Sequence, residues 1–233
     1  MTTLLLQLAG PLQAWGSSSR FNRRATDDAP TKSGIVGLLA AADGRRRTDP
    51  IEDLAGLRLG VRVDQPGQLL RDYHTALVRT GRNSYTTQLS DRFYLSDAVF
   101  LAAVEGPTPL LEGLADALRR PKYLLSLGRR SCVPSRPVLL GLTPMSVDDA
   151  LAEQPWLASE RVARRNDATV IVETVADCLP GTDGAEVRSD APVSFDPVRR
   201  RHGSRSVLRG AVRLANPLGT SHHDPLAALD DAS

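Results

Sequence analysis

Hydrophobic and polar positions in the first part of the chain fall into blocks that predict a strand and then a helix. The segment TTLLLQLAGP (2–11) is almost continuously apolar and ends in a Gly-Pro pair, which is typical of a buried strand. Further on, TKSGIVGLLAAADG (31–44) is short and apolar. It predicts a helix with Thr31 or Ser33 as its N-cap and Gly44 as its C-cap.

The same kind of pattern continues to about residue 142. LRLGVRVD (57–64) alternates apolar residues with arginine, which predicts a half-exposed strand, and LLRDYHTALV (69–78) predicts the next one. AVFLAAVEG (98–106) and RPVLLGL (136–142) predict two more strands. Between them, PTPLLEGLADALRRP (107–121) places leucines along one helical face and has prolines at both ends, which predicts a helix.

The order of these elements predicts an α+β fold. Strand, helix, strand, strand, a polar insertion, strand, helix and strand come close to the split βαββαβ pattern of ferredoxin-like domains. We therefore expect one core over residues 1–145, with an inserted β-hairpin at 79–96, and with helices on one face of the sheet that leave the other face free. Residues 146–216 predict a C-terminal extension with short strands, and 217–233 a flexible tail.

Composition narrows the class of protein. A chain of 233 residues with 41% hydrophobic residues can bury a sizeable core. Its N-terminal apolar stretch is too short to cross a bilayer and follows no basic segment, so we expect a cytoplasmic protein without a membrane partner. Cys132 and Cys178 lie far apart, without the spacing of a zinc or redox pair, and we expect both to be reduced.

The charge balance adds one further indication. The net charge of +2 is too small to indicate a nucleic-acid-binding protein by itself. Of the 29 basic residues, however, all but Lys32 and Lys122 are arginines. Because guanidinium groups pair with phosphates and stack on bases, clusters of arginine remain informative.

The stretch PTKSG (30–34) is a candidate anion site. Lys32 and two hydroxyl residues coincide there with the start of the predicted helix, where free N–H groups and the helix dipole favour an anion. The glycine spacing of a Walker A motif is missing, which argues against nucleotide hydrolysis. The alternatives left open are a bound phosphate and ordinary helix capping.

The stretch RDYHT (71–75) raises the question of catalysis. Tyr73 and His74 are residue types that move protons in metal-independent RNA cleavage. On a strand, however, neighbouring side chains point to opposite faces, so Arg71 and Tyr73 share one face while Asp72 and His74 share the other. This alternation argues against a catalytic pair. It favours either a histidine that is packed against backbone or a Tyr73 that stacks on a base.

Three basic segments suit a nucleic acid. The insertion 79–96 interleaves arginines with aromatic residues, a mixture that binds single strands because bases stack while phosphates are neutralised. The segment LGRRSC (127–132) presents two arginines after a glycine, and VRRRHGSR (198–205) is a basic loop that contacts RNA or an acidic partner, or is simply solvated. Carboxylate pairs lack the partners of a two-metal site, and no G-x-S-x-G elbow is present, so we expect no metal and no cofactor.

Five blocks together resemble one known family. LLLQLAGPLQAWG, PTKSGIVGLLAAADG, LRDYHT, RFYLSDAVF and LGRRSC occur in the order found in the CasD family. These are repeat-associated RAMP proteins, which cap the 5′ end of the guide RNA in the type I-E CRISPR surveillance complex Cascade. The resemblance covers residues 4 to about 141. It implies a ferredoxin-like (RRM/RAMP) core in which the insertion 79–96 is a thumb-like β-hairpin.

The resemblance also implies a set of site residues. Phosphates would be held by arginines and Lys32, and bases would stack on Tyr73 or Trp15. The implied RNA-binding residues are Gln13, Trp15, Thr31, Lys32, Ser33, Arg71, Tyr73, His74, Arg129, Arg130 and Ser131. The implied thumb and partner contacts are Arg79, Arg82, Tyr85, Arg92, Phe93 and Tyr94.

The function that the resemblance implies is binding without catalysis. The chain would hold the repeat-derived 5′ handle of the crRNA and contact the backbone subunit CasC and the large subunit CasA. In the assembled complex it would also meet other Cascade subunits and target DNA. The alternative is a metal-independent endoribonuclease that processes CRISPR repeat RNA, because relatives in another subtype cleave it.

Overall fold

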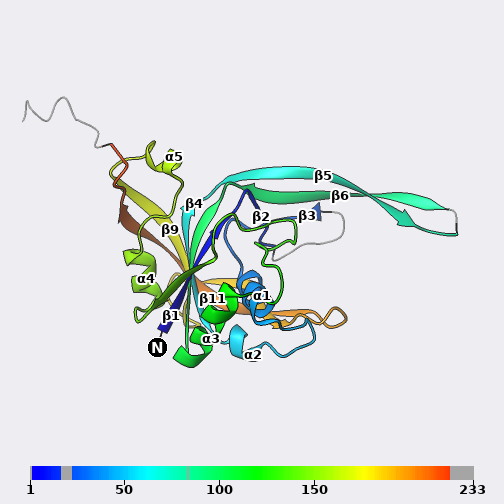
Figure 1. Ribbon diagram of the computed structural model, residues 1–233, viewed down its shortest axis with the longest axis horizontal. Coiled ribbons are helices and arrows are strands. Elements are labelled where there is room, and N and C mark those ends of the chain that lie inside the picture. The colour runs from blue at the N-terminus through cyan, green and yellow to red at the C-terminus, as the bar shows by residue number, and fades with distance from the viewer. Residues whose placement is uncertain (1, 17–22, 83, 221–233) are drawn as a thin grey trace, which may run out of the picture.

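The computed structural model of the protein describes residues 2–16, 23–82 and 84–220. Its strands are β1 (Thr2–Ala9), β2 (Leu12–Gln13), β3 (Arg23–Arg24), β4 (Arg58–Gln65), β5 (Gln68–Arg79), β6 (Tyr85–Ser96), β7 (Val99–Gly106), β8 (Leu139–Thr143), β9 (Thr169–Asp177), β10 (Glu186–Ser194) and β11 (Arg201–Ala215) (Figure 1). Its helices are α1 (Lys32–Asp43), α2 (Glu52–Ala55), α3 (Thr108–Arg119), α4 (Val147–Glu153) and α5 (Glu160–Ala163). Most of the expected tail 217–233 lies outside the described residues.

A seven-stranded antiparallel sheet forms the body of the protein. Its strand order is β10-β11-β9-β4-β7-β1-β8. β1 is apolar on both sides because both of its faces are covered. Leu4, Leu6 and Leu8 pack in the main hydrophobic core, while Leu5 packs in a second cluster on the other face. The α+β class predicted from the pattern of elements is confirmed.

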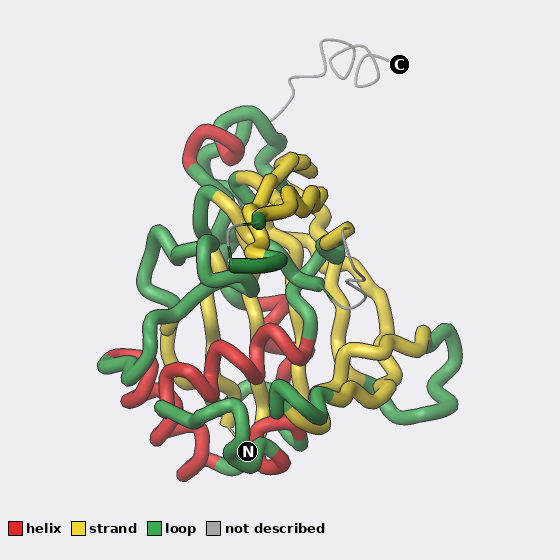
Figure 2. Tube along the Cα trace, turned by 90° about the vertical axis from the view of Figure 1, so that its right-hand side faces the viewer, coloured by secondary structure: helices red, strands yellow, loops and turns green. Residues whose placement is uncertain are grey.

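Two predicted helices form as the sequence indicates. Thr31 caps α1, since its hydroxyl accepts a hydrogen bond from the Gly34 N–H at 3.2 Å, and Gly44 ends the helix with a left-handed φ of 83°. α3 buries Leu111, Leu114 and Leu118 against the same core. In Figure 2, most of the helical turns lie in the lower half of the molecule, across the sheet strands.

The second face of the sheet is covered, which contradicts the expectation that it is free. Val147 and Leu151 of α4 pack against Leu5 and the neighbouring strand. The fully buried Arg62 holds the end of this helix, because its guanidinium donates to the Leu151 carbonyl at 2.6 Å and to the Gln154 carbonyl at 2.7 Å. Residues after 145 therefore supply the layer that covers this face. The elements predicted up to residue 142 did not include it.

The strand predicted at 69–78 does not lie in the body of the sheet. Among the described strands, β5 pairs with β6 alone, over twelve residue pairs from Gln68↔Ser96 to Arg79↔Tyr85, and the two strands form a long arm that projects from the body (Figure 1). Gly67, with a φ of +73°, turns the chain out of the sheet after β4, and β7 takes the place beside β4 instead. The hairpin is thus longer than the expected insertion 79–96.

The C-terminal strands extend the same sheet. β9 pairs with β4 on one side and with β11 on the other, and β10 forms the outer edge. Cys132 is buried and Cys178 half-buried, and neither forms a disulfide. Burial raises the pKa of the Cys132 thiol, so this side chain behaves as a small apolar core residue.

Candidate nucleic-acid interface

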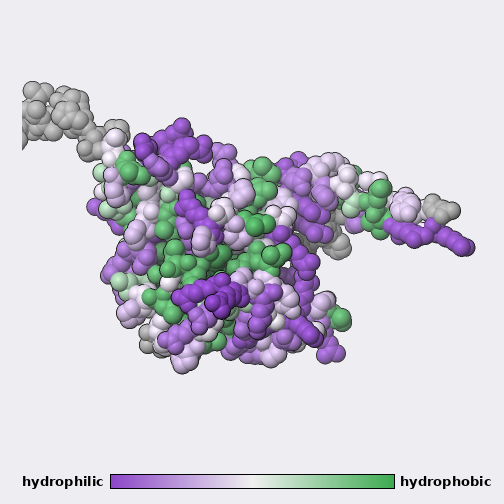
Figure 3. Space-filling model, in the orientation of Figure 1, coloured by the Kyte–Doolittle hydropathy of each residue, from purple (hydrophilic) through white to green (hydrophobic). Residues whose placement is uncertain are grey.

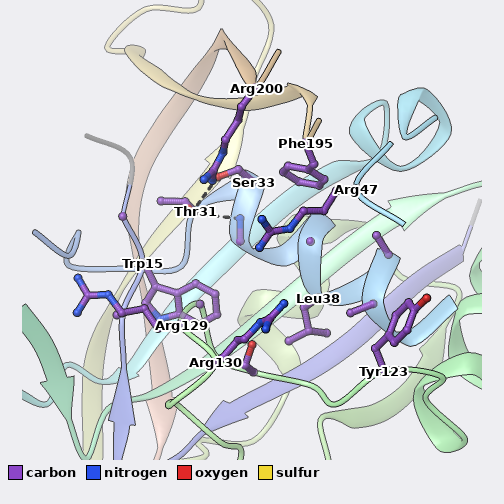
Figure 4. A pocket seen from close by; sticks show the side chains of 18 of the residues that line it. Trp15, Thr31, Ser33, Leu38, Arg47, Tyr123, Arg129, Arg130, Phe195 and Arg200 are labelled. Atoms are coloured by element: carbon purple, nitrogen blue, oxygen red, sulfur yellow. Dashed lines mark hydrogen bonds between the residues drawn. The ribbon is translucent and has the colours of Figure 1, made fainter. Parts of the chain in front are cut away.

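A groove of about 780 Å³ runs along the exposed side of α1 (Figure 4). Small residues of the helix, Gly34, Gly37 and Ala41, form its floor. The walls come from three loops that lie far apart in the sequence: residues 45–47 after α1, residues 123–130 before β8, and residues 195–200 between β10 and β11. The fold thus places an elongated concave surface beside a helix.

The lining of this groove is strongly cationic. Among the described residues that line it, six are arginines and none is acidic. Arg45 is neutralised, because its guanidinium binds both carboxylate oxygens of Asp53, at 2.5 and 2.6 Å. This hydrogen bonding also lowers the pKa of Asp53 and keeps it ionised. Arg45 therefore fixes the loop rather than offering charge to a ligand.

The other arginines are available to a ligand. Within the described part of the chain, the guanidinium groups of Arg46, Arg47, Arg130 and Arg200 form neither ion pairs nor hydrogen bonds. In Figure 4, Arg47, Arg130 and Arg200 reach the space in front of α1 from the three different walls. Several unpaired guanidinium groups around one groove attract a polyanion and contact its phosphates without sequence preference.

Aromatic rings accompany these cations. Tyr123, whose side chain is 49% exposed, stands at one end of the groove, and the half-buried Phe195 lies on the opposite wall (Figure 4). Exposed rings beside arginines are the combination that binds single-stranded nucleic acid, because bases stack on the rings while phosphates meet the guanidinium groups.

Gln13 and Trp15 are buried within the protein, which contradicts their expected role in RNA binding. The Gln13 amide is fully buried and donates to the carbonyls of Leu8 at 3.0 Å and Ala98 at 2.7 Å. Its oxygen accepts a hydrogen bond from Trp15 Nε1 at 3.0 Å. The Trp15 side chain is only 1% exposed, because its ring packs against Gly34, so no base can stack on it.

Lys32 is also engaged within the protein. Its ammonium binds Asp177 at 2.9 Å, and its backbone N–H donates to Asp190 at 2.8 Å. This geometry contradicts the expectation that Lys32 is free to hold a phosphate. Thr31 is occupied in capping the helix, and Ser33 is buried beside it, although both line the groove. The start of α1 is thus joined to the C-terminal strands.

The two adjacent arginines of the glycine loop have different surroundings. Arg129 donates to the carbonyls of Phe93 at 3.1 Å and Arg24 at 2.7 Å, and its guanidinium lies 4.7 Å from the centre of the Tyr94 ring. Arg129 therefore fastens the loop to the arm and is not free for RNA. Arg130 is exposed and faces the groove, with the exposed Ser131 next to it.

The arm carries the residues that raised the question of catalysis. Arg71 and Tyr73 are exposed, whereas Asp72 and His74 are half-buried, so the predicted alternation of faces is confirmed. Arg71 pairs with Asp91 at 2.8 Å. These residues lie on the projecting hairpin rather than on a central strand of the core, which corrects the expected placement.

The expected thumb contacts separate into two groups. Arg79, Arg82 and Tyr85 lie near the tip of the arm, where the Arg79 guanidinium donates to the carbonyls of Gly81 at 3.0 Å and Arg82 at 2.6 Å. Near the base of the arm, Arg92 and Phe93 are half-buried.

One of the residues near the base cannot meet a partner directly. The side chain of Tyr94 is only 5% exposed and belongs to the main core. Phe93 is covered as well, since the Arg23 guanidinium lies 5.2 Å from the centre of its ring. The contacts expected of Tyr94 are therefore contradicted by its burial.

Sequence reasoning missed part of the groove. It did not single out Arg46, Arg47, Tyr123 or Phe195. The run GRRRT (44–48) offered a signal, because three arginines follow the glycine that ends α1. The segment 198–205 was recognised as basic. Its position beside α1 could not be predicted, because it depends on the pairing of strands.

The described residues form neither a metal-binding cluster nor a membrane-spanning helix. No group of three or more His, Cys, Asp or Glu side chains in the described ranges is arranged to hold a metal ion. No helix formed by these residues has the length and apolar character needed to cross a bilayer.

The fold and groove define an α+β protein whose site suits a nucleic acid. Residues 3–208 match the profile of the CRISPR-associated Cas5 proteins, and the chain belongs to this family. A curated relative is the CRISPR system Cascade subunit CasD of Escherichia coli (strain K12), which is 37% identical over 156 residues, covering 59% of this chain and 70% of that protein.

Two solved structures agree with this assignment. One, described as the crystal structure of a Cas protein, has a TM-score of 0.71 and 37% identity over 94% of this chain and 98% of its own. The other belongs to a CRISPR RNA-guided surveillance complex and has a TM-score of 0.79 and 34% identity, with 98% of both chains covered.

Proposed function

We propose that the protein is a non-catalytic subunit of a type I-E Cascade complex that binds the repeat-derived 5′ handle of the crRNA. Its membership of the Cas5 family and its similarity to CasD support this role. The observation that carries the RNA contact is the groove along α1, where four unpaired arginines and two aromatic rings converge without a carboxylate among the described lining residues.

The proposed contacts differ from the set implied by the sequence. Arg46, Arg47, Arg130 and Arg200 neutralise phosphates, while Tyr123 stacks on a base. Ser131, next to Arg130, stays within reach of the same strand as a hydrogen-bond donor. The buried Gln13, Trp15 and Lys32 support the groove from within.

We assign the four strands β8, β1, β7 and β4 to a ferredoxin-like RAMP core. Taken in chain order as first to fourth, β1, β4, β7 and β8 lie in the order fourth, first, third, second. α1 follows the first strand and α3 the third, and both belong to the main core on one face. This arrangement supports the split βαββαβ assignment.

The arm is the proposed thumb. Leu69, Tyr73 and Leu77 are 66%, 60% and 75% exposed, which is unusual for large apolar side chains, and Figure 3 shows hydrophobic residues on the surface of the projecting arm. We propose that this surface packs against the backbone subunit CasC beside the first guide nucleotides, with Arg71, Arg79, Arg82 and Tyr85 along it. The large subunit CasA and target DNA approach in the assembled complex.

Catalysis is the alternative function. It would need an acid and a base that meet one phosphate. Tyr73 and His74 point to opposite faces of the arm, which supports binding over cleavage.

The first test is co-purification. The tagged full-length chain, expressed from its own locus, is expected to carry repeat-bearing guide RNA and neighbouring Cascade subunits. RNA sequencing and mass spectrometry identify them. Purified chain without either would contradict the proposal.

The second test separates binding from cleavage. Repeat RNA is incubated with the purified chain in EDTA, and wild type is compared with His74→Ala and Tyr73→Phe. We expect intact RNA in every reaction. Site-specific cleavage that disappears in His74→Ala would establish the endoribonuclease instead.

A further inference from the structure

We propose that the loop 195–200, contributed by the C-terminal strands, forms the closing wall of the RNA groove, with Phe195 stacking on a base and Arg200 contacting a phosphate. This inference rests on the proposed function and assigns an RNA-binding role to a part of the chain outside the blocks that resemble CasD. The two residues come from the connection between β10 and β11.

Phe195 is placed to offer an aromatic face. Its side chain is half-buried and packs against the main core. The ring also lies along the floor of the groove, since a Cβ added at Gly37 would come within 3.8 Å of the Phe195 ring. Figure 4 shows the ring at the upper edge of the groove, near Arg47. A base entering above α1 would therefore meet the uncovered part of the ring.

Arg200 approaches from the same loop. Its side chain points toward Ser33 at the N-terminal end of α1 (Figure 4), and it pairs with no carboxylate in the described part of the chain. Its neighbour Arg199 is equally charged and exposed but does not line the groove. The chain thus contains a matched control for charge at the adjacent position.

The strands that flank the loop are joined to the start of α1 by ionic contacts. Arg205 of β11 binds Asp190 of β10 at 2.7 Å and also Asp177 of β9, and these two carboxylates bind Lys32 at the start of the helix. The loop itself is closed by Asp196, whose carboxylate accepts hydrogen bonds from the backbone N–H groups of residues 198 and 199. A fixed wall loses little entropy when RNA binds.

The test measures the affinity of the full chain for a labelled single-stranded RNA with the repeat sequence of the same locus, over a range of salt concentrations. Arg200→Gln is compared with Arg199→Gln, and Phe195→Leu keeps apolar packing while removing the aromatic face. Thermal unfolding verifies that each variant is folded. Arg47→Gln and Arg130→Gln report separately on the groove as a whole.

We expect Arg200→Gln to reduce the slope of log affinity against log salt by about 0.7, the value for one phosphate contact of a single strand. Phe195→Leu is expected to lower affinity about tenfold without changing the slope. Arg199→Gln should behave as wild type. If Arg200→Gln and Phe195→Leu also behave as wild type while Arg47→Gln and Arg130→Gln weaken binding, this inference is overturned and the proposed function stands. If none of these four substitutions changes RNA binding, both this inference and the proposed function are contradicted.

Discussion

The guanidinium of Arg129 lies 4.7 Å from the centre of the Tyr94 ring and, through its hydrogen bond to the Phe93 carbonyl, joins the glycine loop to the base of the arm. The adjacent Arg130 makes no such contact and faces the groove. A pair of arginines that looks uniform in the sequence thus divides into a structural residue and a binding residue.

This division predicts opposite phenotypes. Arg129→Ala should lower the free energy of unfolding by about 2 kcal/mol, because two charged hydrogen bonds and a cation–π contact are lost. Arg130→Ala should leave stability within about 0.5 kcal/mol of wild type and weaken RNA binding. Urea unfolding and RNA titration of both variants check this. Equal stability of the two variants would contradict it.

The ionic contacts of Asp190 predict a pH dependence of stability. Burial opposes the ionisation of Asp190, but the hydrogen bonds and charge of Arg205 outweigh it and lower the pKa of this carboxyl. Since the pKa is lower in the folded than in the unfolded state, the stabilisation is complete above about pH 5 and is lost as pH falls through the folded pKa.

Asp190→Asn should therefore cost about 3 kcal/mol at neutral pH, as expected when one partner of a buried ion pair is removed. The difference from wild type should narrow below about pH 4. Urea unfolding across this pH range measures it. Asp116→Asn, at an exposed ion pair, should show almost no difference at any pH. A constant difference for Asp190→Asn would refute the pKa argument.

Alanine substitutions at two glycines should change the stability of the protein in opposite directions. At Gly128, φ is +89° and a Cβ would lie 1.8 Å from the Ala14 carbonyl oxygen, so Gly128→Ala should destabilise the protein by about 3 kcal/mol or more. At Gly113, inside α3, a Cβ meets nothing within 4 Å, so Gly113→Ala should stabilise it by about 0.5 to 1 kcal/mol. Thermal and urea unfolding of both variants give the sign directly.

A charged substitution on the exposed surface of the arm should impair assembly without lowering the stability of the chain. Leu77→Glu changes an exposed side chain on a strand that is paired on one side only, so the melting temperature should stay within about 2 °C of wild type. Recovery of neighbouring subunits with the tagged chain should fall strongly, because a charge replaces an apolar contact. Normal recovery would show that this surface is not an interface.

The main strands and helices of residues 2–142 could be predicted because their periodicity and caps are local features, whereas the short elements β2, β3 and α2 were not predicted. Thr31 and Gly44 bound α1 as expected. The placement of 69–78 could not be predicted, because alternation is the same whether a strand lies in a sheet or in a projecting hairpin.

The candidate site was predictable only in part for a similar reason. Arg130 and the basic run near Arg200 are visible in the sequence. Lys32 and Arg129 are paired, whereas Arg47 is not. This difference depends on long-range contacts. Trp15 appeared to be a stacking residue because burial of a single aromatic side chain cannot be seen in one sequence.

The salt dependence of RNA binding by Arg47→Gln/Arg130→Gln tests the central claim most directly. Fluorescence anisotropy with labelled repeat RNA gives the affinity at each salt concentration, and Arg136→Gln, an exposed arginine away from the groove, serves as the control. We predict that the double variant binds more weakly and that its slope of log affinity against log salt is smaller by about 1.4, or 0.7 for each phosphate contact. An affinity and slope equal to those of wild type would contradict the claim that RNA lies in the groove along α1.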